Sequence, residues 1–247
     1  MGWRLAHIFR HPIKAHGREA LAKVDLTEGR CLPLDRHWAV AHDAAMLMPG
    51  WNPCMNFTRG AKVPGLQAIR SVWDGSTLTL THPDLAPLTI DPDTQAGEAA
   101  LLDWLRPLHS VGRAGPAKLV KAGRGMTDTD FESVSILNLA SNAALGAQLG
   151  ADLGLDRWRA NLWLDGIEPW AECDLIGRDL TIGAARLRVV EPIGRCRATM
   201  VDCATGQIDH DTLAALERAR GDTNFGVYAT VIQSGPIQTG DVVELAA

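Results

Sequence analysis

The sequence predicts a mixed, β-rich fold that contains a few short helices. Short apolar runs separated by turn residues dominate the chain, whereas stretches with helical spacing are few. Strand-like runs occur near both ends, at Arg4–Phe9 and at Val242–Leu245. We expect these terminal strands to share one barrel-like core, because closing a sheet on itself leaves no unpaired edge.

The first half is predicted to consist of strands and turns followed by one helix. Leu78–Leu80 and Leu88–Ile90 flank a turn-rich segment, as paired strands do. Gln95–Leu108 places alanine, tryptophan and leucine three or four residues apart, which predicts an amphipathic helix packed on the core. Arg113–Asp130 is rich in glycine, lysine and polar residues, and we interpret it as a mobile connection or lid.

The next predicted unit is a strand that leads into a helix. Val134–Leu139 is predicted to be a buried strand, and Asn142–Leu149 a helix with Ser141 as its N-cap and Gly150 after its end. This arrangement would aim free backbone N–H groups and the positive end of the helix dipole at a cleft, which suits a phosphate. The alternative is that Ser141 only caps a structural helix.

The remaining elements are predicted to be structural. A hairpin is expected from Leu180–Ile182 and Leu187–Val189, with further strands at Val227–Ile232 and Val242–Leu245. Asp211–Arg220 is predicted to be a short helix.

Composition argues against several classes of partner. The 247 residues are 46% hydrophobic and 21% charged, with a formal net charge of -5, which suffices for one large or two small domains. The acidic balance argues against nucleic acid or an anionic membrane as the main partner. No run approaches the roughly 18 apolar residues of a membrane span, so we expect a cytoplasmic protein without one.

The cysteine pattern excludes common metal and disulfide scaffolds. The five cysteines are an odd number without a C-x-x-C pair, which argues against a disulfide framework and against structural zinc. The sequence also lacks the C-x4-C-x2-C run of a plant-type iron–sulfur cluster. Any redox chemistry would therefore need electrons from a separate protein.

Cys196 is the main site candidate, because it lies between Arg195 and Arg197 in a segment predicted as strand, turn and strand. Two guanidinium groups favour the thiolate, which is both the nucleophile and the soft metal ligand of cysteine chemistry. A reactive group on a loop held by strands is a common arrangement for a site. The alternative is a loop cysteine flanked by solvated arginines.

Two polar residues before the strand at Leu162–Leu164 suit an anionic or heterocyclic ligand. Arg159 can grip a phosphate or a planar heterocycle with two hydrogen bonds, and Asn161 supplies both a donor and an acceptor. Taken singly, however, basic residues are more often solvated surface charges.

Short segments spread over most of the chain occur in one characteristic order. They are PIKAHG (12–17), LDRHWAV (34–40), SILNLASNAAL (135–145), RWRANLWLDG (157–166), WAE (170–172), GRDLTIGA (177–184), RCRATMVD (195–202), TG (205–206), FGVY (225–228) and GPIQTGDV (235–242). From residue 135 onward this set resembles a MOSC domain, found in molybdenum cofactor sulfurases and in the mitochondrial amidoxime reducing component and its bacterial relatives. The two upstream segments resemble the β-barrel segment that precedes MOSC in those reductases. The ordered set carries the specificity, since no single piece is diagnostic.

The resemblance implies a MOSC-type β-barrel core. It divides the chain into an N-terminal β-barrel-like segment at 1–92, a helix and connecting loop at 93–130, and a MOSC domain at 131–247.

By correspondence, the resemblance also implies a molybdenum–pterin cofactor (Mo-molybdopterin) with Cys196 as the metal ligand. The residues expected to anchor its organic part are Lys14, Arg36, Ser141, Asn142, Arg159, Asn161 and Arg195. Asp202 becomes a polar candidate near the reaction centre, although it could equally be the first residue of a turn. The chain departs from the family at Ala15, where serine is common, and at Ala160, where proline is usual.

The implied function is reduction of N-hydroxylated small molecules, with electrons from a separate flavoprotein or ferredoxin. Two alternatives stay open. Cys196 could carry sulfane sulfur as a persulfide and hand it to a molybdenum or other metal–sulfur centre. The chain could also be a non-enzymatic protein that stores or delivers the intact cofactor.

Overall fold

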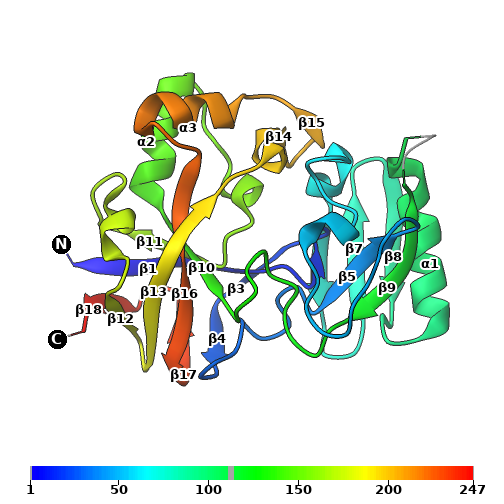
Figure 1. Cartoon of the computed structure of the whole chain (residues 1–247), viewed down its shortest axis with the longest axis horizontal. Coiled ribbons are helices and arrows are strands. Elements are labelled where there is room, and N and C mark those ends of the chain that lie inside the picture. The colour runs from blue at the N-terminus through cyan, green and yellow to red at the C-terminus, as the bar shows by residue number, and fades with distance from the viewer. Residues whose placement is uncertain (1, 111–113, 247) are drawn as a thin grey trace.

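A closed β-barrel and a smaller β-rich lobe beside it make up the fold (Figure 1). The computed structural model describes residues 2–110 and 114–246. In this part of the chain strands far outnumber the three α-helices, so the predicted β-rich class with few helices is confirmed.

Seven strands in the described residues form the barrel. They are β1 (Trp3–Arg10), β10 (Val134–Asn138), β11 (Leu162–Asp165), β12 (Asp179–Ile182), β13 (Ala185–Gly194), β16 (Asn224–Gln233) and β18 (Val242–Leu245). Their order is β11, β10, β16, β13, β12, β18 and β1, and β1 pairs with β11 to close the ring. β10 and β11 are parallel, and the other neighbours are antiparallel.

The first and last strands belong to the same barrel, as the sequence predicted, and they are also neighbours in it. Trp3 of β1 pairs with Val243 of β18. Outside the ring, β3 (Glu19–Leu21) pairs with β1, and β4 (Lys23–Leu26) pairs with β17 (Gly235–Gln238). The beginning of the chain therefore shares its sheets with segments far along the sequence.

Apolar residues that alternate along the strands fill the barrel. Leu5, Leu164, Leu187 and Val227 are each 0% exposed and belong to one apolar cluster. Because successive side chains of a strand point to opposite faces, the intervening positions face outward, where the helices, the second lobe and solvent cover them.

The second lobe, on the right of Figure 1, has its own apolar core. Leu101 and Leu105 of its helix are fully buried against two small sheets. The lobe contains β2 (Ile13–Lys14), β5 (Trp38–His42) and β9 (Pro116–Lys121) in one sheet, β6 (Arg70–Trp73), β7 (Leu78–His82) and β8 (Leu85–Ile90) in the other, and the helix α1 (Gln95–Leu105).

One prediction for this lobe is confirmed and one is wrong. The predicted helix at Gln95–Leu108 is α1 followed by a 3-10 turn at Arg106–Leu108. The predicted mobile connection at 113–130 instead contains β9, which pairs along β5. Cross-strand pairing orders this segment despite its polar composition, because Leu119 packs into the lobe's core. Residues 111–113 lie outside the described part of the chain.

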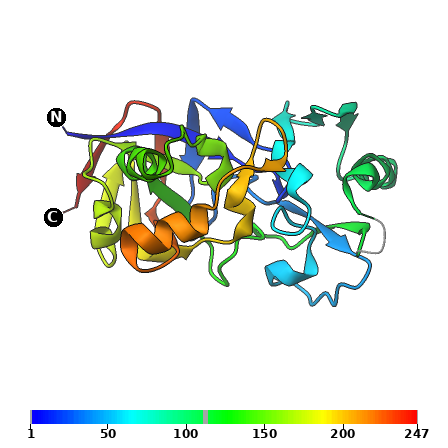
Figure 2. The same ribbon diagram turned by 90° about the horizontal axis from the view of Figure 1, so that it is seen from above.

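Two helices, α2 (Leu139–Leu149) and α3 (Thr212–Arg220), lie side by side at one end of the barrel (Figures 1 and 2). α3 confirms its prediction, with the Asp211 side chain accepting from the backbone N–H of Ala214 as an N-cap. α2 ends at Gly150, whose φ of 64° is the left-handed conformation that glycine adopts easily. Within the described ranges, no helix is long and apolar enough to cross a membrane.

Candidate functional site

A cavity of about 180 Å³ opens where the barrel meets the second lobe. The turn after β2, the end of β13 and the loop between β9 and β10 all contribute to its wall. Five of the nine residues that the sequence singled out line this wall: Lys14, Arg36, Arg159, Arg195 and Cys196. The other four lie elsewhere: Ser141, Asn142, Asn161 and Asp202.

The cavity wall has a large excess of positive charge. Within the part of the chain that the structure describes, six cationic side chains line it against one carboxylate, that of Asp128. Besides the four cations already named, the wall carries Arg59 and Arg157. Arg157 is neutralised by two hydrogen bonds to the Asp209 carboxylate at 2.9 and 2.8 Å. Lys14 and Arg36 pair with the carboxylates of Asp128 and Asp35. The hydrogen bonds given for Arg59, Arg159 and Arg195 in the described residues go to sulfur or carbonyl oxygen, so these three cations create the field that attracts an anion.

Arg36 lies two residues before β5 and links both walls of the cavity. Its guanidinium pairs with the carboxylate of Asp35 and donates to the carbonyl oxygen of Arg159 at 2.8 Å. Burial opposes the charge of Asp35, but Arg36 and hydrogen bonds from His11 hold its pKa well below the usual range. Arg36 is thus oriented by a buried carboxylate that stays ionised.

Arg159 follows a 3-10 turn at Leu155–Trp158 and is held by carbonyl oxygens. Its guanidinium donates to Gly17 at 3.1 Å and to Ile13 at 3.4 Å. Burial, with the neighbouring charge of Arg36 next in importance, lowers the pKa of Arg159 to about 9. The Arg159 guanidinium stays charged at neutral pH. Carbonyl oxygens, which carry no net negative charge, have replaced its hydrating water, so an anion in the cavity would stabilise it.

Arg195, directly before the candidate thiol, is held in a similar way. It donates to the carbonyl oxygen of Trp158 at 2.9 Å and to that of Phe225 at 2.8 and 2.5 Å. Its guanidinium also lies 5.6 Å from the ring centroid of each of these two residues. Burial lowers the pKa of Arg195 to about 10. Carbonyl oxygens and aromatic rings therefore orient this guanidinium, and its predicted effect on the Cys196 thiol stays a prediction.

Lys14 and Asp128 form the ion pair at one side of the cavity. The Lys14 ammonium lies 2.5 Å from the Asp128 carboxylate and donates to the carbonyl oxygen of Met126 at 2.7 Å. The Lys14 side chain is 6% exposed and that of Asp128 is 58% exposed. A ligand can therefore reach the carboxylate more easily than the lysine that it neutralises.

The backbone around the cavity is strained at three positions. Ala15, Arg36 and Arg159 have φ values of 64°, 50° and 50°, in the left-handed region. Each such non-glycine residue costs on the order of 1–3 kcal/mol, and such residues collect at functional sites. Arg36 and Arg159, which are joined by a hydrogen bond across the cavity, thus both extend from strained backbone.

Cys196 is exposed at the cavity edge, between β13 and a 3-10 turn at Arg197–Met200. Its carbonyl oxygen accepts from the backbone N–H and the hydroxyl of Thr199, at 3.1 and 3.0 Å. These bonds fix the turn and leave the thiol available. A second thiol, Cys54, also lines the cavity and accepts from Arg59 at 3.2 Å.

Two of the predicted cofactor residues support the wall from behind. Asn142 accepts from the indole N–H of Trp158 at 2.7 Å, and Trp158 lines the cavity. Asn161 accepts from the backbone N–H and the hydroxyl of Ser135, at 3.1 and 2.9 Å, and Ser135 also lines the cavity. Both asparagines are buried, at 7% and 1% exposure, so they position cavity residues.

Ser141 does not cap its helix. The N-cap of α2 is Asn138, whose side chain accepts from the N–H of Ala140, so the helix starts earlier than predicted. The Ser141 hydroxyl is fully buried, donates to Glu172 at 2.7 Å and accepts from the N–H of Trp170 at 2.8 Å. The N-cap role predicted for Ser141 is therefore wrong, whereas the phosphate site at this helix end stays a prediction.

Asp202 begins a turn, the alternative that the sequence left open. Its carboxylate accepts from the N–H of Ala204 at 2.9 Å and from the hydroxyl of Thr205 at 3.1 Å. The carbonyl oxygen of Asp202 accepts from Gly206 at 2.8 Å, which closes the turn. This residue therefore shapes a loop outside the cavity lining.

Sequence reasoning missed four functional candidates on the wall: Arg59, Asp128, Ser135 and Tyr228. Burial raises the pKa of Tyr228 to about 12, and the charge of Asp128 contributes. Ser135 and Tyr228 lie within the characteristic segments at 135–145 and 225–228, which was an available signal. Arg59 and Asp128 come from segments outside the characteristic set, so no such signal pointed to them.

Comparison with known families places the chain in one of them. Residues 124–244 match the MOSC domain, and residues 2–106 match the MOSC N-terminal beta barrel domain. The chain therefore belongs to the MOSC domain proteins, and it carries both domains.

Among curated proteins, this chain is similar to molybdenum cofactor sulfurases. The Drosophila erecta sulfurase is 28% identical over 142 residues, covering 54% of this chain and 18% of the sulfurase. The Drosophila grimshawi sulfurase is 33% identical over 94 residues, covering 38% and 12%. The chain thus spans less than a fifth of the length of these relatives.

A solved structure, that of the YuaD protein from Bacillus subtilis, has a similar fold. Its TM-score is 0.50 at 14% identity, and the match covers 99% of this chain and 96% of YuaD. At this identity the likeness bears on the fold alone.

Proposed function

We propose that this chain binds a molybdenum–pterin cofactor in the cationic cavity and reduces N-hydroxylated small molecules with electrons from a separate protein. The observation that carries the proposal is the convergence of buried and partly buried cations and an exposed thiol on one cavity. The relation to molybdenum cofactor sulfurases supports the choice of cofactor.

The residues present fit this group. Arg159 and Arg195 are partly buried cations whose partners are carbonyl oxygens, so a phosphate would supply the missing negative charge. Lys14 and Arg36 would add two further cations, and the Asp128 carboxylate would accept from the N–H donors of a pterin. The Cys196 thiolate would bind the metal, because soft sulfur ligands suit such centres.

The reaction converts an N-hydroxy group, two electrons and two protons into N–H and water. When bound, the cofactor supplies a metal that can take up the oxygen atom and exchange the two electrons. The chain's own residues bind and orient the cofactor and hold positive charge beside it. The exposure of Cys196 leaves the reacting end of the cavity open to a small substrate.

The electrons must come from outside the described residues. All five cysteines are free thiols, and no group of three or more His, Cys, Asp or Glu side chains in the described ranges could hold a metal ion. An iron–sulfur cluster needs such a group. A flavoprotein or ferredoxin is the class of donor that we propose.

The test is the molybdenum and pterin content of protein purified from a host that makes the cofactor. Cys54→Ser is the matched control for Cys196→Ser, because both thiols line the same cavity. We expect about one molybdenum per chain in the wild type and the control, and loss of the metal in Cys196→Ser. Equal metal in all three proteins would contradict the ligand role of Cys196.

A sulfur-carrier function is the second candidate, favoured by the exposure of Cys196 and by the sulfurase relatives. In that case purified protein would carry cyanide-labile sulfur on Cys196 and no molybdenum. A non-enzymatic cofactor carrier would retain molybdenum and pterin but show no turnover of N-hydroxylated compounds with reduced methyl viologen.

A further inference from the structure

The segment that follows β5 and includes the 3-10 turn at Cys54–Asn56 displays apolar side chains to solvent. We call residues 43–56 the methionine loop. Met46, Met48 and Met55 are 84%, 71% and 65% exposed, the three highest values among large hydrophobic residues in the described ranges. Figure 2 shows this light blue segment at the lower edge of the molecule. Clustered exposed apolar side chains mark interaction surfaces more often than isolated ones do.

The methionine loop is held in shape by its own hydrogen bonds. Asn52 is 2% exposed, accepts from the N–H of Met48 at 2.8 Å and donates to the carbonyl oxygens of Met48 and Gly50. Asn56 accepts from the N–H of Met46 at 3.1 Å. The indole of Trp51 donates to Thr127 at 3.0 Å, which ties the loop to the segment that carries Asp128. Because the loop backbone is already ordered, binding of a partner would cost less conformational entropy of the loop.

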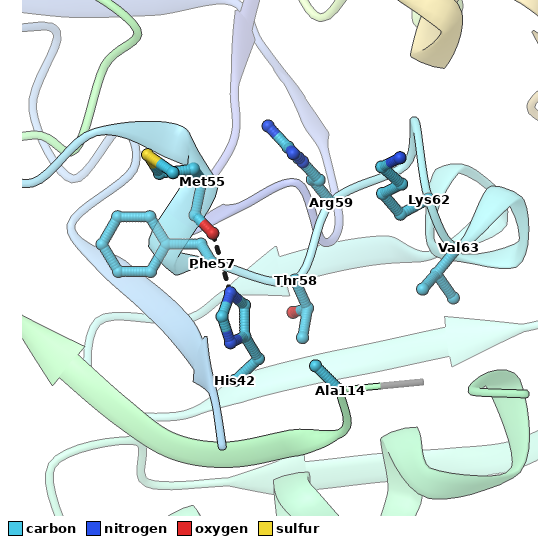
Figure 3. A pocket seen from close by; sticks show the side chains of 8 residues that line it. All are labelled: His42, Met55, Phe57, Thr58, Arg59, Lys62, Val63 and Ala114. Carbon is cyan, nitrogen blue, oxygen red and sulfur yellow. Dashed lines mark hydrogen bonds between the residues drawn. The ribbon is translucent and has the colours of Figure 1, made fainter. Parts of the chain in front are cut away.

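A hollow of about 310 Å³ lies at the base of this loop (Figure 3). Met55, Phe57 and Val63 give it an apolar lining, and Arg59 and Lys62 bring positive charge to the same wall. Arg59 lines both this hollow and the cofactor cavity. A protein seated on the hollow would therefore lie against the cavity wall.

We propose that the methionine loop, together with Arg59 and Lys62, is the docking surface for an electron-transfer protein with an acidic face. The proposal rests on the proposed function, which requires electrons from a separate protein. Methionine and arginine are enriched at protein interfaces, and methionine adapts its shape to a partner.

Charge favours this class of partner. The chain has a formal net charge of -5, which by itself opposes association with an acidic protein. Arg59 and Lys62 beside the apolar loop attract such a protein to this surface, close to the cationic cavity that Arg59 also lines. The positive charges beside the apolar loop thus favour an acidic partner and favour its binding with the acidic face toward the loop.

The test measures binding of a purified [2Fe–2S] ferredoxin to the full-length chain at low and at physiological salt. Two variants probe the surface: the double variant Met46→Ser/Met48→Ser and the charge reversal Lys62→Glu. Matched controls are Val72→Ser, which removes another exposed apolar side chain, and Lys23→Glu on exposed β4. We expect each surface variant to weaken binding at least fivefold, added salt to weaken wild-type binding, and the controls to bind as wild type. Unchanged binding in both surface variants would overturn the proposal.

Activity with two donors separates this proposal from the proposed function. Reduced methyl viologen needs no docking surface, so the surface variants should keep the viologen-driven rate and lose the ferredoxin-driven rate. A wild type inactive with viologen contradicts the proposed function, whereas variants that retain the full ferredoxin-driven rate contradict the docking surface. Self-association or binding to anionic vesicles that depends on Met46 and Met48, without ferredoxin binding, would also overturn it.

Discussion

The guanidinium of Arg36 donates to the backbone carbonyl oxygen of Arg159 at 2.8 Å, across 123 positions of sequence. Arg36 belongs to the second lobe and Arg159 to the segment that leads into barrel strand β11, so this bond joins the two walls of the cavity. Both residues have a φ of 50°, and both line the cavity. The geometry of the cationic cavity and the contact between the lobes thus depend on the same pair.

Arg36→Ala should be strongly destabilising. The Asp35 side chain is 0% exposed and would become an unpaired buried charge, which costs about 3–5 kcal/mol. Arg36→Lys keeps the positive charge but loses the planar guanidinium with its two-pronged hydrogen bonding, so the loss of unfolding free energy should be smaller. Urea unfolding of the three proteins measures this order, and a loss below about 1 kcal/mol in Arg36→Ala would contradict the assignment.

Arg159→Asn should separate ligand binding from stability. Asparagine tolerates the left-handed backbone, and removing a desolvated guanidinium offsets its lost hydrogen bonds to Gly17 and Ile13. We expect the unfolding free energy to change by less than about 1 kcal/mol and inorganic phosphate to bind at least tenfold more weakly. Isothermal titration calorimetry measures the affinity, with Arg178→Asn on the exposed surface as control. Equal phosphate affinity in both variants would remove Arg159 from the anion site.

Asp128→Asn should strengthen phosphate binding. The carboxylate neutralises Lys14 at 2.5 Å, and an anion must compete with it. Removing this repulsion should raise phosphate affinity about threefold to tenfold, which corresponds to roughly 1 kcal/mol. Asp130→Asn, two residues away and exposed, is the matched control. Weaker binding in Asp128→Asn would mean that the carboxylate is needed to orient Lys14.

Glu172 should make stability depend on pH. Burial raises the pKa of this carboxyl above its ordinary value of 4.5, and hydrogen bonds from Ser141 and Asn138 offset only part of the effect. Because the folded state holds the proton more tightly, the stabilising contribution is complete below pH 4.5 and is lost as pH rises through the folded pKa. Glu172→Gln should flatten this fall in unfolding free energy, whereas exposed Glu168→Gln should retain it. An identical pH profile in both variants would contradict the assignment.

Ser141→Ala should weaken the fold and leave the cavity intact. The substitution leaves the Glu172 carboxyl without its 2.7 Å hydrogen bond, which costs about 1–3 kcal/mol. Molybdenum content per folded chain should equal that of the wild type, because Ser141 lies outside the cavity lining. Metal loss without a change in stability would restore Ser141 to the cofactor site.

Local signals in the sequence located the elements but not always their ends. The turn that exposes Cys196 and the left-handed end of α2 at Gly150 both follow from residue type. Asn138 and Ser141 are both good N-caps, and pairing of Asn138 with Leu164 in the barrel selects the first. Sheet register therefore determines where α2 begins, which local propensity left open.

The parts of the cavity that the sequence did not reveal come from long-range contacts. Lys14 and Asp128 are 114 positions apart, and no spacing rule connects them. Asn142 and Asn161 have the right chemistry for a ligand, but burial directs them to Trp158 and Ser135 instead. Residue type indicated a polar role, and only packing determined which partner each side chain met.

The position of β1 between β11 and β18 has a consequence for biosynthesis. A ribosome releases β1 first and β18 last of the barrel strands, and until then both β1 and β12 keep an open edge. Lys14 follows β1 closely, whereas Cys196 and Tyr228 lie on late segments of the same cavity wall. Such long-range pairing is slow, because loop-closure entropy precedes the gain from contacts. The barrel can therefore close only after translation has passed β18.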